Sequence, residues 1–573
     1  MRGFFIFILE VLKLIKRGGE KMKLKGAQVL VECLREQGVD TIFGYPGGAV
    51  LPIYDVLYDV KDIKHILTAH EQGATHAADG YARATGKVGV VIVTSGPGAT
   101  NTVTGVATAY MDSVPLVVFT GQVGSSLIGR DSFQEVDITG ITTPITKHNY
   151  IVKDPDQLPH IIRQAFSIAR SGRPGPVLID IPKDIQVAMV EYKPLQIEEE
   201  QKETSSKIHD NIHKAIEAIN ECERPVIYAG GGINIAGATE KLVDFAEKIK
   251  APVSCSLMGM GAFPGNHPYY MGMVGMHGTR FSNYAFSNCD LLIALGARFS
   301  DRVISDVKKF APKARIIHVD IDPAELGKNV TTHIEVCGDV GEVLDVLNES
   351  VKEKLENEWN MQIEEWKRVH PLSYKMNGSL SPQYIIEKLY ELTGGQAIIS
   401  TEVGQNQMWA AQFYKFTEPR TFISSGGLGT MGYGLGASIG AAIGRPDKRV
   451  VNVAGDGSFK MNSTELATVS RYKVPIIQLV LNNHSLGMVK QWQDLFFDKR
   501  YSYSQLGQDV DFVKLAEAYG IKAFRMNNNN QVEDILSQAL ELNEPVLIEC
   551  DIHPDDKVYP IVPPGAGIDE LID

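Results

Sequence analysis

Two oxygen-bearing side chains, each placed after an apolar run, carry the clearest chemistry in this sequence. Asp456 follows the run 450–454 and stands between two glycines, and Asn483 follows the run 474–481. A helix predicted over 462–469 joins the runs, so both side chains are expected at the carboxyl edge of one parallel sheet, where such sheets bind ligands. Mg²⁺ prefers carboxylate and amide oxygens, and glycine lets the backbone approach a phosphate. This spacing favours a magnesium diphosphate site over a simple Gly-Asp-Gly turn.

Length, charge and cysteine usage limit the class of protein. The chain has 573 residues, which is too long for one hydrophobic core, and 44% of them are apolar and 22% charged, as in globular proteins. The formal net charge of −13 argues against nonspecific binding of nucleic acid. Six scattered cysteines without a Cys-x-x-Cys pair predict reduced core thiols, a cytoplasmic protein and no zinc site.

The segment 1–21 has three interpretations. It could be a signal peptide or an amphipathic anchor, but Glu10 and Lys13 interrupt its apolar run and no small-residue cleavage site follows. The run is also shorter than the roughly 20 residues of a membrane span. We favour the third interpretation, in which translation starts at Met22 and the extension is not part of the protein. No membrane association is expected.

Helical and strand patterns alternate along the rest of the chain. Such alternation predicts an α/β fold with three doubly wound domains, each around a central parallel sheet. The expected domains are 22–190, 208–351 and 381–573, and the charged stretch 196–207 is expected to be a linker. In the first domain we expect a helix at 26–37, a helix at 50–57, and strands at 41–43, 64–68, 89–93 and 116–120.

The motif around Asp456 and Asn483 resembles that of thiamine diphosphate enzymes. Further segments narrow the resemblance to the acetohydroxyacid synthase (acetolactate synthase) family of large catalytic subunits, over the whole of 22–573. These segments are 44–48 (GYPGG), 133–135 (FQE), 298–302 (RFSDR) and 486–493 (LGMVKQWQ). The resemblance implies the thiamine diphosphate-binding fold.

The resemblance also implies the acid that activates the cofactor. Glu71, which follows the strand 64–68, would hydrogen-bond the aminopyrimidine ring of thiamine. In the family this residue faces the diphosphate half of a second subunit, so we expect a homodimer or a dimer of dimers. Gln134 is expected to hydrogen-bond a reacting oxygen, and Lys183 to lie at the mouth of the site.

Other site residues follow from the same resemblance. Asn406 stands where the family commonly has histidine beside the diphosphate, and its amide is expected to donate in that place. The expected substrate-binding residues are Phe133, Arg302, Met488 and Trp492. Those for thiamine diphosphate are Gly47, Val403, Gln405, Asn406, Gly429, Met431, Gly457 and Ser458, and the metal ligands are Asp456, Asn483 and the backbone carbonyl of Ser485.

The domain 208–351 is expected to bind FAD in a structural role. Its glycine cluster 230–232 is weak as a dinucleotide fingerprint, because no glycine stands three residues further on. A central domain without a ligand is the alternative. The resemblance to flavin-containing members assigns FAD to Arg173, Gly230, Gly231, Gly232, Met276, His277, Gly278, Thr279, Gly296, Arg298, Asp301, Asp320 and Asp339.

The reaction implied is the first common step of branched-chain amino acid biosynthesis. Pyruvate loses CO₂ on thiamine diphosphate, and its hydroxyethyl group joins a second pyruvate or 2-ketobutyrate. Arg302 would hold the second carboxylate with two hydrogen bonds. The family pairs this chain with a small regulatory subunit, and the proline-rich stretch 559–566 is expected to form a lid. The alternatives are a pyruvate oxidase, a flavin-free catabolic acetolactate synthase and a non-catalytic protein on the same fold.

Overall fold

The structure is a computed structural model that describes residues 21–195, 211–376, 378–507 and 509–573. The predicted extension, except Lys21, and the predicted linker 196–207 lie outside these residues. The chain divides into two compact units. The first contains the residues up to 204 except 83–86, and the second contains 83–86 and 205–573.

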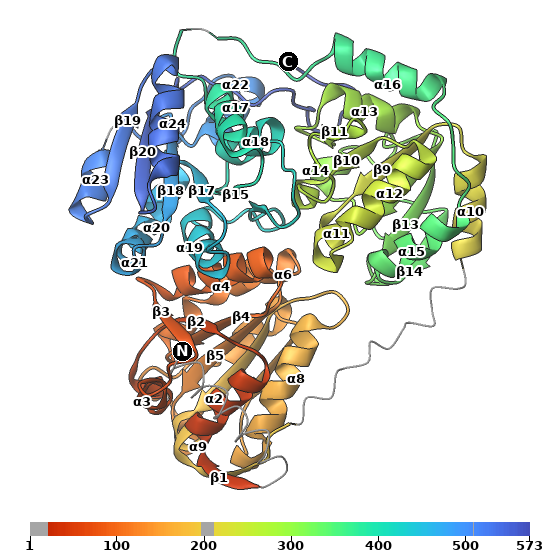
Figure 1. The fold of residues 1–573 in the computed structure, drawn as a ribbon. Coiled ribbons are helices and arrows are strands. Elements are labelled where there is room, and N and C mark those ends of the chain that lie inside the picture. Colours follow the sequence, from red (N-terminus) through yellow and green to blue (C-terminus); the bar gives the residue numbers. More distant parts are fainter. Residues whose placement is uncertain (1–20, 196–210, 377, 508) are drawn as a thin grey trace, which may run out of the picture. The chain divides into compact units, whose positions relative to one another are not determined.

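The first unit is built on a six-stranded parallel sheet (Figure 1). Its strand order is β3-β2-β4-β5-β7-β6. The strands are β2 (Thr41–Tyr45), β3 (Lys64–Leu67), β4 (Gly89–Val93), β5 (Leu116–Gln122), β6 (His148–Ile151) and β7 (Val177–Pro182). The helices are α2 (Gly26–Glu36), α3 (Leu51–Leu57), α4 (Glu71–Thr85), α5 (Pro97–Thr100), α6 (Val103–Met111), α7 (Ile138–Thr142), α8 (Leu158–Arg170) and α9 (Lys183–Val187). The strand β1 (Met22–Lys25) precedes these elements and β8 (Met189–Tyr192) follows them, and the two strands form a separate antiparallel pair.

The second unit begins with a further six-stranded parallel sheet in the order β11-β10-β9-β12-β13-β14. Its strands are β9 (Pro225–Ala229), β10 (Val253–Cys255), β11 (Tyr270–Met273), β12 (Leu291–Leu295), β13 (Arg315–Asp320) and β14 (Ile334–Cys337). Its helices are α10 (Ile212–Glu221), α11 (Gly231–Ala236), α12 (Thr239–Ile249), α13 (Arg280–Asn288), α14 (Asp301–Ile304), α15 (Val340–Ser350) and α16 (Glu358–Val369).

The third sheet, also in the second unit, has the order β16-β15-β17-β18-β20-β19. Its strands are β15 (Ile398–Thr401), β16 (Phe422–Ile423), β17 (Val450–Gly455), β18 (Ile476–Asn482), β19 (Lys522–Met526) and β20 (Val546–Asp551). Its helices are α17 (Pro382–Thr393), α18 (Gln405–Phe413), α19 (Gly434–Gly444), α20 (Asp456–Asn462), α21 (Leu466–Tyr472), α22 (Gly487–Phe496), α23 (Phe512–Ala518) and α24 (Val532–Glu541).

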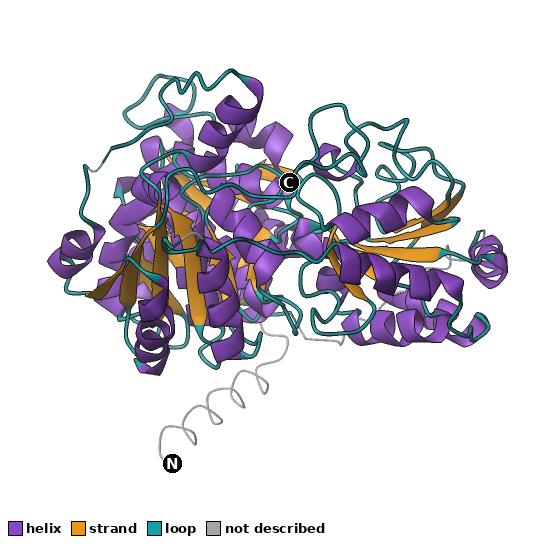
Figure 2. Ribbon diagram, turned by 90° about the horizontal axis from the view of Figure 1, so that it is seen from above, coloured by secondary structure: helices purple, strands orange, loops and turns teal. Residues whose placement is uncertain are grey.

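The predicted α/β class is confirmed, because helices cover both faces of parallel sheets (Figure 2). Central strands such as β4 and β12 are buried at every position, as expected when a sheet is covered on both sides. In each sheet the strand order reverses beside the first strand, and ligands bind at such a reversal. Among the described residues, no helix has the length and apolar character that crossing a membrane requires.

Candidate active site

Asp456 lies at the start of α20, directly after β17. The residue is 1% exposed, and neither carboxylate oxygen accepts a hydrogen bond from the described residues. Burial raises the pKa of this carboxyl to about 6, while the charge of Lys460 and the nearby backbone N–H groups lower it in part. A buried carboxylate without a partner is costly, and a bound cation removes that cost. The side chain therefore fits a ligand of Mg²⁺.

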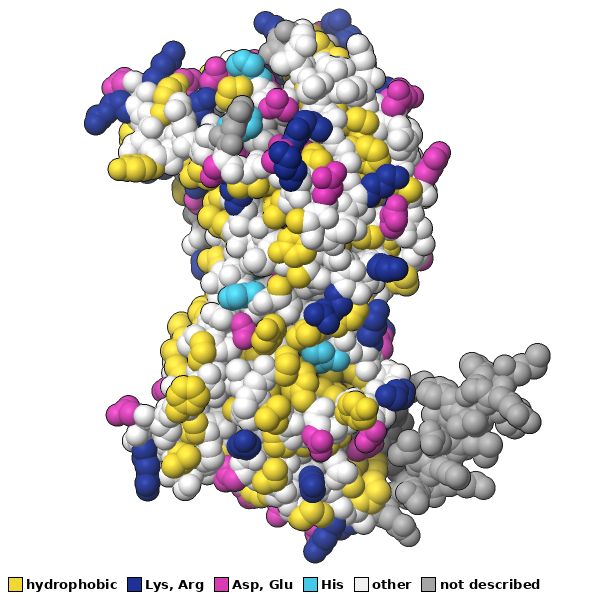
Figure 3. Space-filling view, turned by 90° about the vertical axis from the view of Figure 1, so that its left-hand side faces the viewer, with side chains coloured by type: hydrophobic (Ala, Val, Ile, Leu, Met, Phe, Trp, Pro, Cys, Tyr) yellow, Lys and Arg dark blue, Asp and Glu magenta, His cyan; other side chains and the backbone are white. Residues whose placement is uncertain are grey.

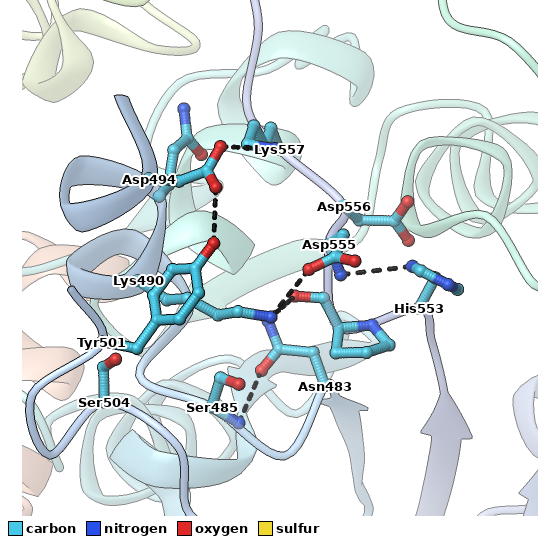
Figure 4. Close-up of polar contacts among 12 residues, drawn as sticks. Asn483, Ser485, Lys490, Asp494, Tyr501, Ser504, His553, Asp555, Asp556 and Lys557 are labelled. Atoms are coloured by element: carbon cyan, nitrogen blue, oxygen red, sulfur yellow. Dashed lines mark hydrogen bonds and ion pairs between the residues drawn. The ribbon is translucent and has the colours of Figure 1, made fainter. Parts of the chain in front are cut away.

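Asn483 follows β18, the parallel neighbour of β17. Gly455 pairs with Leu481 in this ladder, so Asp456 and Asn483 leave adjacent strands at the same edge. The Asn483 Oδ1 accepts a hydrogen bond from the backbone N–H of Ser485 at 3.1 Å and keeps a second lone pair. Figure 4 draws this contact. One carboxylate, one amide oxygen and the nearby carbonyl of Ser485 form a donor set that suits Mg²⁺.

Glu402 is a buried acid that the sequence reasoning missed. It follows β15 and accepts hydrogen bonds from Gly432 N at 2.8 Å, Leu435 N at 3.1 Å and Ser458 Oγ at 2.7 Å. Burial raises the pKa of this carboxyl, and the hydrogen bonds counteract that shift. Glu402 therefore joins the three glycine-rich loops that follow β15, β16 and β17. Its position directly after a buried strand, like that of Asp456, was the available signal.

The loop after β15 also carries Gln405 and Asn406. The Asn406 Nδ2 donates to the carbonyls of Glu402 at 2.9 Å and Val453 at 2.8 Å. In this conformation both amide hydrogens are engaged, so Asn406 braces two loops, where the sequence predicted a donor to the diphosphate. Gly404 precedes this pair with a φ of +141°, a value that favours glycine.

The remaining residues predicted for thiamine diphosphate lie on the same glycine-rich loops. Gly429 has a φ of +69°, and Met431 is half-buried just before α19. The Ser458 hydroxyl donates a hydrogen bond to Glu402 and accepts one from Gly432 N. Val403 lies partly exposed beside Gly404, and Gly457 packs its backbone against Leu486.

Helix α22 begins beside the predicted metal ligands and carries Met488 and Trp492. Both are half-buried, whereas Lys490 and Gln491 are the buried positions of this helix. The apolar pair is therefore partly accessible, as a substrate-contacting surface requires. Gly487, the first helical residue, lies so close to Gln405 and Asn483 that a Cβ would approach Gln405 Oε1 to 2.0 Å.

Residues 553–558, here called the C-terminal segment, are held against α22 by charged pairs (Figure 4). The Lys490 Nζ donates to the carbonyl of Pro554 and to Asp555, each at 2.8 Å. Lys557 pairs with Asp494 at 3.1 Å, and Tyr501 donates to the same carboxylate. These contacts fix the segment beside the start of α22.

In the first unit, Glu71 is the first residue of α4. Its Oε2 accepts a hydrogen bond from the Asn101 Nδ2 at 2.9 Å. Gly98 lies beside it, since a Cβ there would be 3.3 Å from Glu71 Oε1 and 2.7 Å from Thr94. Gly47 likewise has its backbone against the Thr94 side chain. The loops after β2, β3 and β4 thus meet around this carboxylate.

Gln134 joins this cluster through its backbone. A Cβ on Gly96 would approach the Gln134 backbone to 2.9 Å, and both residues have a φ of +60°. Neighbouring Phe133 is 88% exposed. Lys183 is an exposed residue at the start of α9, and no described contact brings it to Glu71.

The glycines predicted for FAD lie where the strand order of the central sheet reverses. Gly230 follows β9 and Gly296 follows β12, and a Cβ on Gly230 would lie 2.0 Å from the Gly296 carbonyl oxygen. Gly232 is in similar contact with Gly296. The close backbones and their place at the reversal fit a dinucleotide site. Gly231 follows β9, and Met276, Gly278 and Thr279 follow β11, an edge strand of the same sheet.

Several other residues predicted for FAD have structural partners. Asp339 caps α15 by accepting from Gly341 N at 2.9 Å, and Asp320 accepts from Asp322 N at 2.9 Å. Burial lowers the pKa of His277 to about 4. Arg298 lies just after β12, and its carbonyl accepts a hydrogen bond from Asn329 Nδ2 at 2.9 Å. Arg173 belongs to the first unit, where it donates to Ser113 Oγ.

Arg302 lies on the short helix α14. Its guanidinium is 3.9 Å from Asp301, and both side chains are largely exposed. Its carbonyl accepts a hydrogen bond from Met276 N at 2.8 Å. An exposed ion pair of this length contributes little, so the guanidinium can exchange Asp301 for a substrate carboxylate.

Comparison with known families places this architecture in one enzyme class. Residues 24–141 match the thiamine pyrophosphate enzyme N-terminal TPP binding domain, 212–347 match the central domain, and 402–550 match the C-terminal TPP binding domain. Thiamine pyrophosphate is the same cofactor as thiamine diphosphate. Each match falls on one of the three parallel sheets, and the strands β6, β7 and β15 lie outside the matched residues.

Comparison with individual proteins narrows the class. The chain is 48% identical to the probable acetolactate synthase large subunit of Methanocaldococcus jannaschii, over 96% of this chain and 95% of that protein. It is 45% identical to the acetolactate synthase isozyme 3 large subunit of Escherichia coli, over 96% of this chain and 98% of that protein. It is 47% identical to the acetolactate synthase of Mycobacterium bovis, over 96% of this chain and 91% of that protein. The chain therefore belongs to the thiamine pyrophosphate enzymes and, within them, to the acetolactate synthase large subunits.

Proposed function

We propose that this chain decarboxylates pyruvate and ligates the resulting two-carbon group to a second pyruvate or to 2-ketobutyrate. The observation that supports the proposal most directly is the buried, unpartnered carboxylate of Asp456 beside Asn483, within the region matched to a TPP binding domain. Thiamine diphosphate supplies, when bound, the electron sink for the loss of CO₂. The products are 2-acetolactate or 2-aceto-2-hydroxybutyrate, in branched-chain amino acid biosynthesis.

Each predicted site residue would have its own role in the reaction. Asp456 and Asn483 would hold Mg²⁺, and Glu402 would keep the surrounding loops in register. Glu71, held by Asn101, would exchange a proton with the cofactor's aminopyrimidine. Arg302 would hold the carboxylate of the second substrate, because a guanidinium matches it with two hydrogen bonds. Gln134 would hydrogen-bond a reacting oxygen.

The test is anaerobic incubation of the purified protein with pyruvate, thiamine diphosphate, Mg²⁺ and FAD. We expect two pyruvates to be consumed for each acetolactate and CO₂ formed. The Glu71→Gln variant keeps the size of the side chain and its contact to Asn101 but cannot transfer a proton, so we expect a loss of at least 10²-fold, the usual scale of acid–base catalysis. The variant should retain cofactor binding.

A pyruvate oxidase is the alternative from the same class, and the same incubation discriminates it. Acetate or acetyl phosphate formed only with an added electron acceptor, without acetolactate, would contradict carboligation. An unchanged rate in Glu71→Gln would contradict the role assigned to that residue.

FAD, partners and location complete the proposal. FAD would bind between the ends of β9, β12 and β13, where the close glycine backbones support it, and would be structural because carboligation moves no electrons to a flavin. The relatives named as large subunits support a small regulatory subunit as partner. We propose a homodimer or a dimer of dimers in the cytoplasm, and the six unbridged cysteines support that location.

A further inference from the structure

Three side-chain amides form a continuous chain of hydrogen bonds from the C-terminal segment to Asn483. The Gln491 Oε1 accepts from Val558 N, and its Nε2 donates to Val558 O, both at 2.9 Å. The Gln405 Nε2 donates to Gln491 Oε1 at 2.9 Å and to Asp556 O at 2.8 Å. The Gln405 Oε1 in turn accepts from Asn483 Nδ2 at 3.0 Å.

All three amides are buried, with exposures of 2% for Gln491, 4% for Gln405 and 5% for Asn483. Water therefore does not compete for these bonds. A buried amide that lost its partner would carry the full cost of an unsatisfied polar group, about 1–3 kcal/mol. The chain of bonds is thus strongly preferred in one arrangement.

The backbone of Val558 fixes the direction of every bond in the chain. A backbone N–H can only donate and a carbonyl can only accept, so Gln491 has one possible orientation. Gln405 must then present its NH₂ to Gln491 and Asp556, which leaves its oxygen for Asn483. Asn483 must present its NH₂ to Gln405. The amide chain therefore reinforces the orientation that the Ser485 N–H also favours, in which the Asn483 Oδ1 is an acceptor, the polarity that a Mg²⁺ ligand needs.

Gly487 shows how closely the surrounding backbone is fitted to this arrangement. A Cβ at this position would lie 2.0 Å from Gln405 Oε1 and 2.6 Å from Asn483 Nδ2. Only glycine allows α22 to start against that hydrogen bond. The same helix, one turn later, supplies Gln491.

We infer that Gln491 is a positioning residue for the metal: through Gln405 it orients the amide of Asn483 and couples that ligand to the C-terminal segment. Gln491 is not one of the predicted metal ligands or substrate-binding residues. Its effect is to select, in advance, the orientation in which the Asn483 oxygen faces the cation. Residues that hydrogen-bond a metal ligand without binding the metal typically contribute 10–100-fold to metal affinity. The inference rests on the Mg²⁺ site but not on the proposed substrates.

The test measures how Mg²⁺ controls the binding of thiamine diphosphate, by equilibrium dialysis of the full chain without pyruvate. In Gln491→Leu we expect the half-saturating Mg²⁺ concentration to rise 10–100-fold. At saturating Mg²⁺ the variant should bind the cofactor as the unmodified protein does. Gln491→Glu, which keeps the shape but places an oxygen against Val558 O, should show a rise in the same direction and serves if Gln491→Leu does not fold.

Gln412→Leu is the matched control. Gln412 also donates to the C-terminal region, to Tyr559 O at 3.1 Å, but it has no bond to Gln405 or Asn483. We expect its Mg²⁺ dependence to stay within about twofold of the unmodified protein. Unchanged Mg²⁺ dependence in folded Gln491 variants would overturn the inference, as would an equal shift in Gln412→Leu. Because no substrate is present, failure of carboligation would be a separate result.

Discussion

Two buried acids, Asp456 and Glu402, follow adjacent strands of the third sheet but have opposite surroundings. Glu402 receives three hydrogen bonds, whereas the Asp456 oxygens receive none from the described residues. A satisfied carboxylate needs no further ligand, and an unsatisfied one does. The first is therefore a structural brace for the cofactor loops, and the second is the residue available to a cation.

We expect Glu402→Gln to destabilise the second unit and to weaken thiamine diphosphate binding. An amide has only one acceptor oxygen, so in either orientation its NH₂ faces the N–H of Gly432 or of Leu435. Leaving a buried donor unpaired costs about 1–3 kcal/mol. Chemical denaturation and cofactor titration of the variant measure both effects.

Ser438→Ala is a suitable comparison for that variant. Ser438 lies inside α19, is also buried and donates to Leu435 O at 2.8 Å, but it is not among the three residues that donate to Glu402. We expect it to keep the cofactor affinity. Equal loss of affinity in both variants would mean that Glu402 has no special role in the loops.

At the residue scale, the sequence predicted what depends on local pattern. Asp456 and Asn483 could be placed together because each follows a strand and the strands are joined by a helix. Glu402 could not be assigned its role, because its partners at 432, 435 and 458 become neighbours only when the chain folds. The engagement of Asn406 with Glu402 and Val453 was hidden for the same reason.

At the scale of elements, a buried acid links β5 to β7 in the first unit. Thr120 and Asp180 are direct partners in this ladder, and the Thr120 hydroxyl donates to Asp180 at 2.7 Å. Gln122 donates to the same carboxylate at 2.9 Å and to Val136 O at 2.8 Å. Burial raises the pKa of Asp180 to about 7. The acid thus braces the strand end from which the loop carrying Gln134 departs.

Asp180 should make the stability of the protein fall as pH rises. Its folded pKa is raised above the ordinary value of 3.8, so its contribution is complete below pH 4 and is lost progressively up to about pH 7. Asp180→Asn mimics the neutral acid and removes this dependence. We expect the melting temperature of the variant, relative to the unmodified protein, to increase between pH 5 and pH 7 and then to level off.

This difference in melting temperature is measured by thermal unfolding of both proteins across that pH range, without cofactors. The comparison cancels the titration of all other groups that the two proteins share. A difference that stays constant with pH, or that decreases as pH rises, would contradict the assignment.

Element boundaries were predictable where one physical cause dominated. The strand β4 matches the predicted run 89–93, because a strand covered on both faces is apolar throughout. The helix predicted over 462–469 is instead divided into α20 and α21, and α20 begins at Asp456 itself. Gly-Asp-Gly read alone favours a turn, and only the fold shows that Gly455 caps a helix there.

At the scale of the whole molecule, the first unit exposes many apolar side chains. Figure 3 shows them on its visible face, in the lower part of that view. Tyr58 is 81% exposed, Phe133 88% and Met189 58%. Exposed apolar surface of this kind often marks an interface, which agrees with the proposed homodimer.

Mixing two inactive variants tests whether a site is shared between subunits. Glu71→Gln and Asp456→Ala alter different units and should each be inactive alone. If the site joins Glu71 of one chain to Asp456 of another, a mixed dimer has one intact site. Random exchange of subunits should then restore about a quarter of the full activity. No recovery after verified exchange would mean that each chain supplies both residues to its own site.

The amide chain from Val558 to Asn483 also has a consequence for the order of events during synthesis. Residues leave the ribosome in sequence order, and domains generally begin to fold as they emerge. Asn483 emerges before Gln491, and both emerge before Val558, whose backbone sets the direction of the hydrogen bonds. In a nascent chain that ends before Val558, the Asn483 oxygen would be held as an acceptor by the Ser485 N–H without the support of the amide chain, and we expect that support to be complete only after the C-terminal segment has been made.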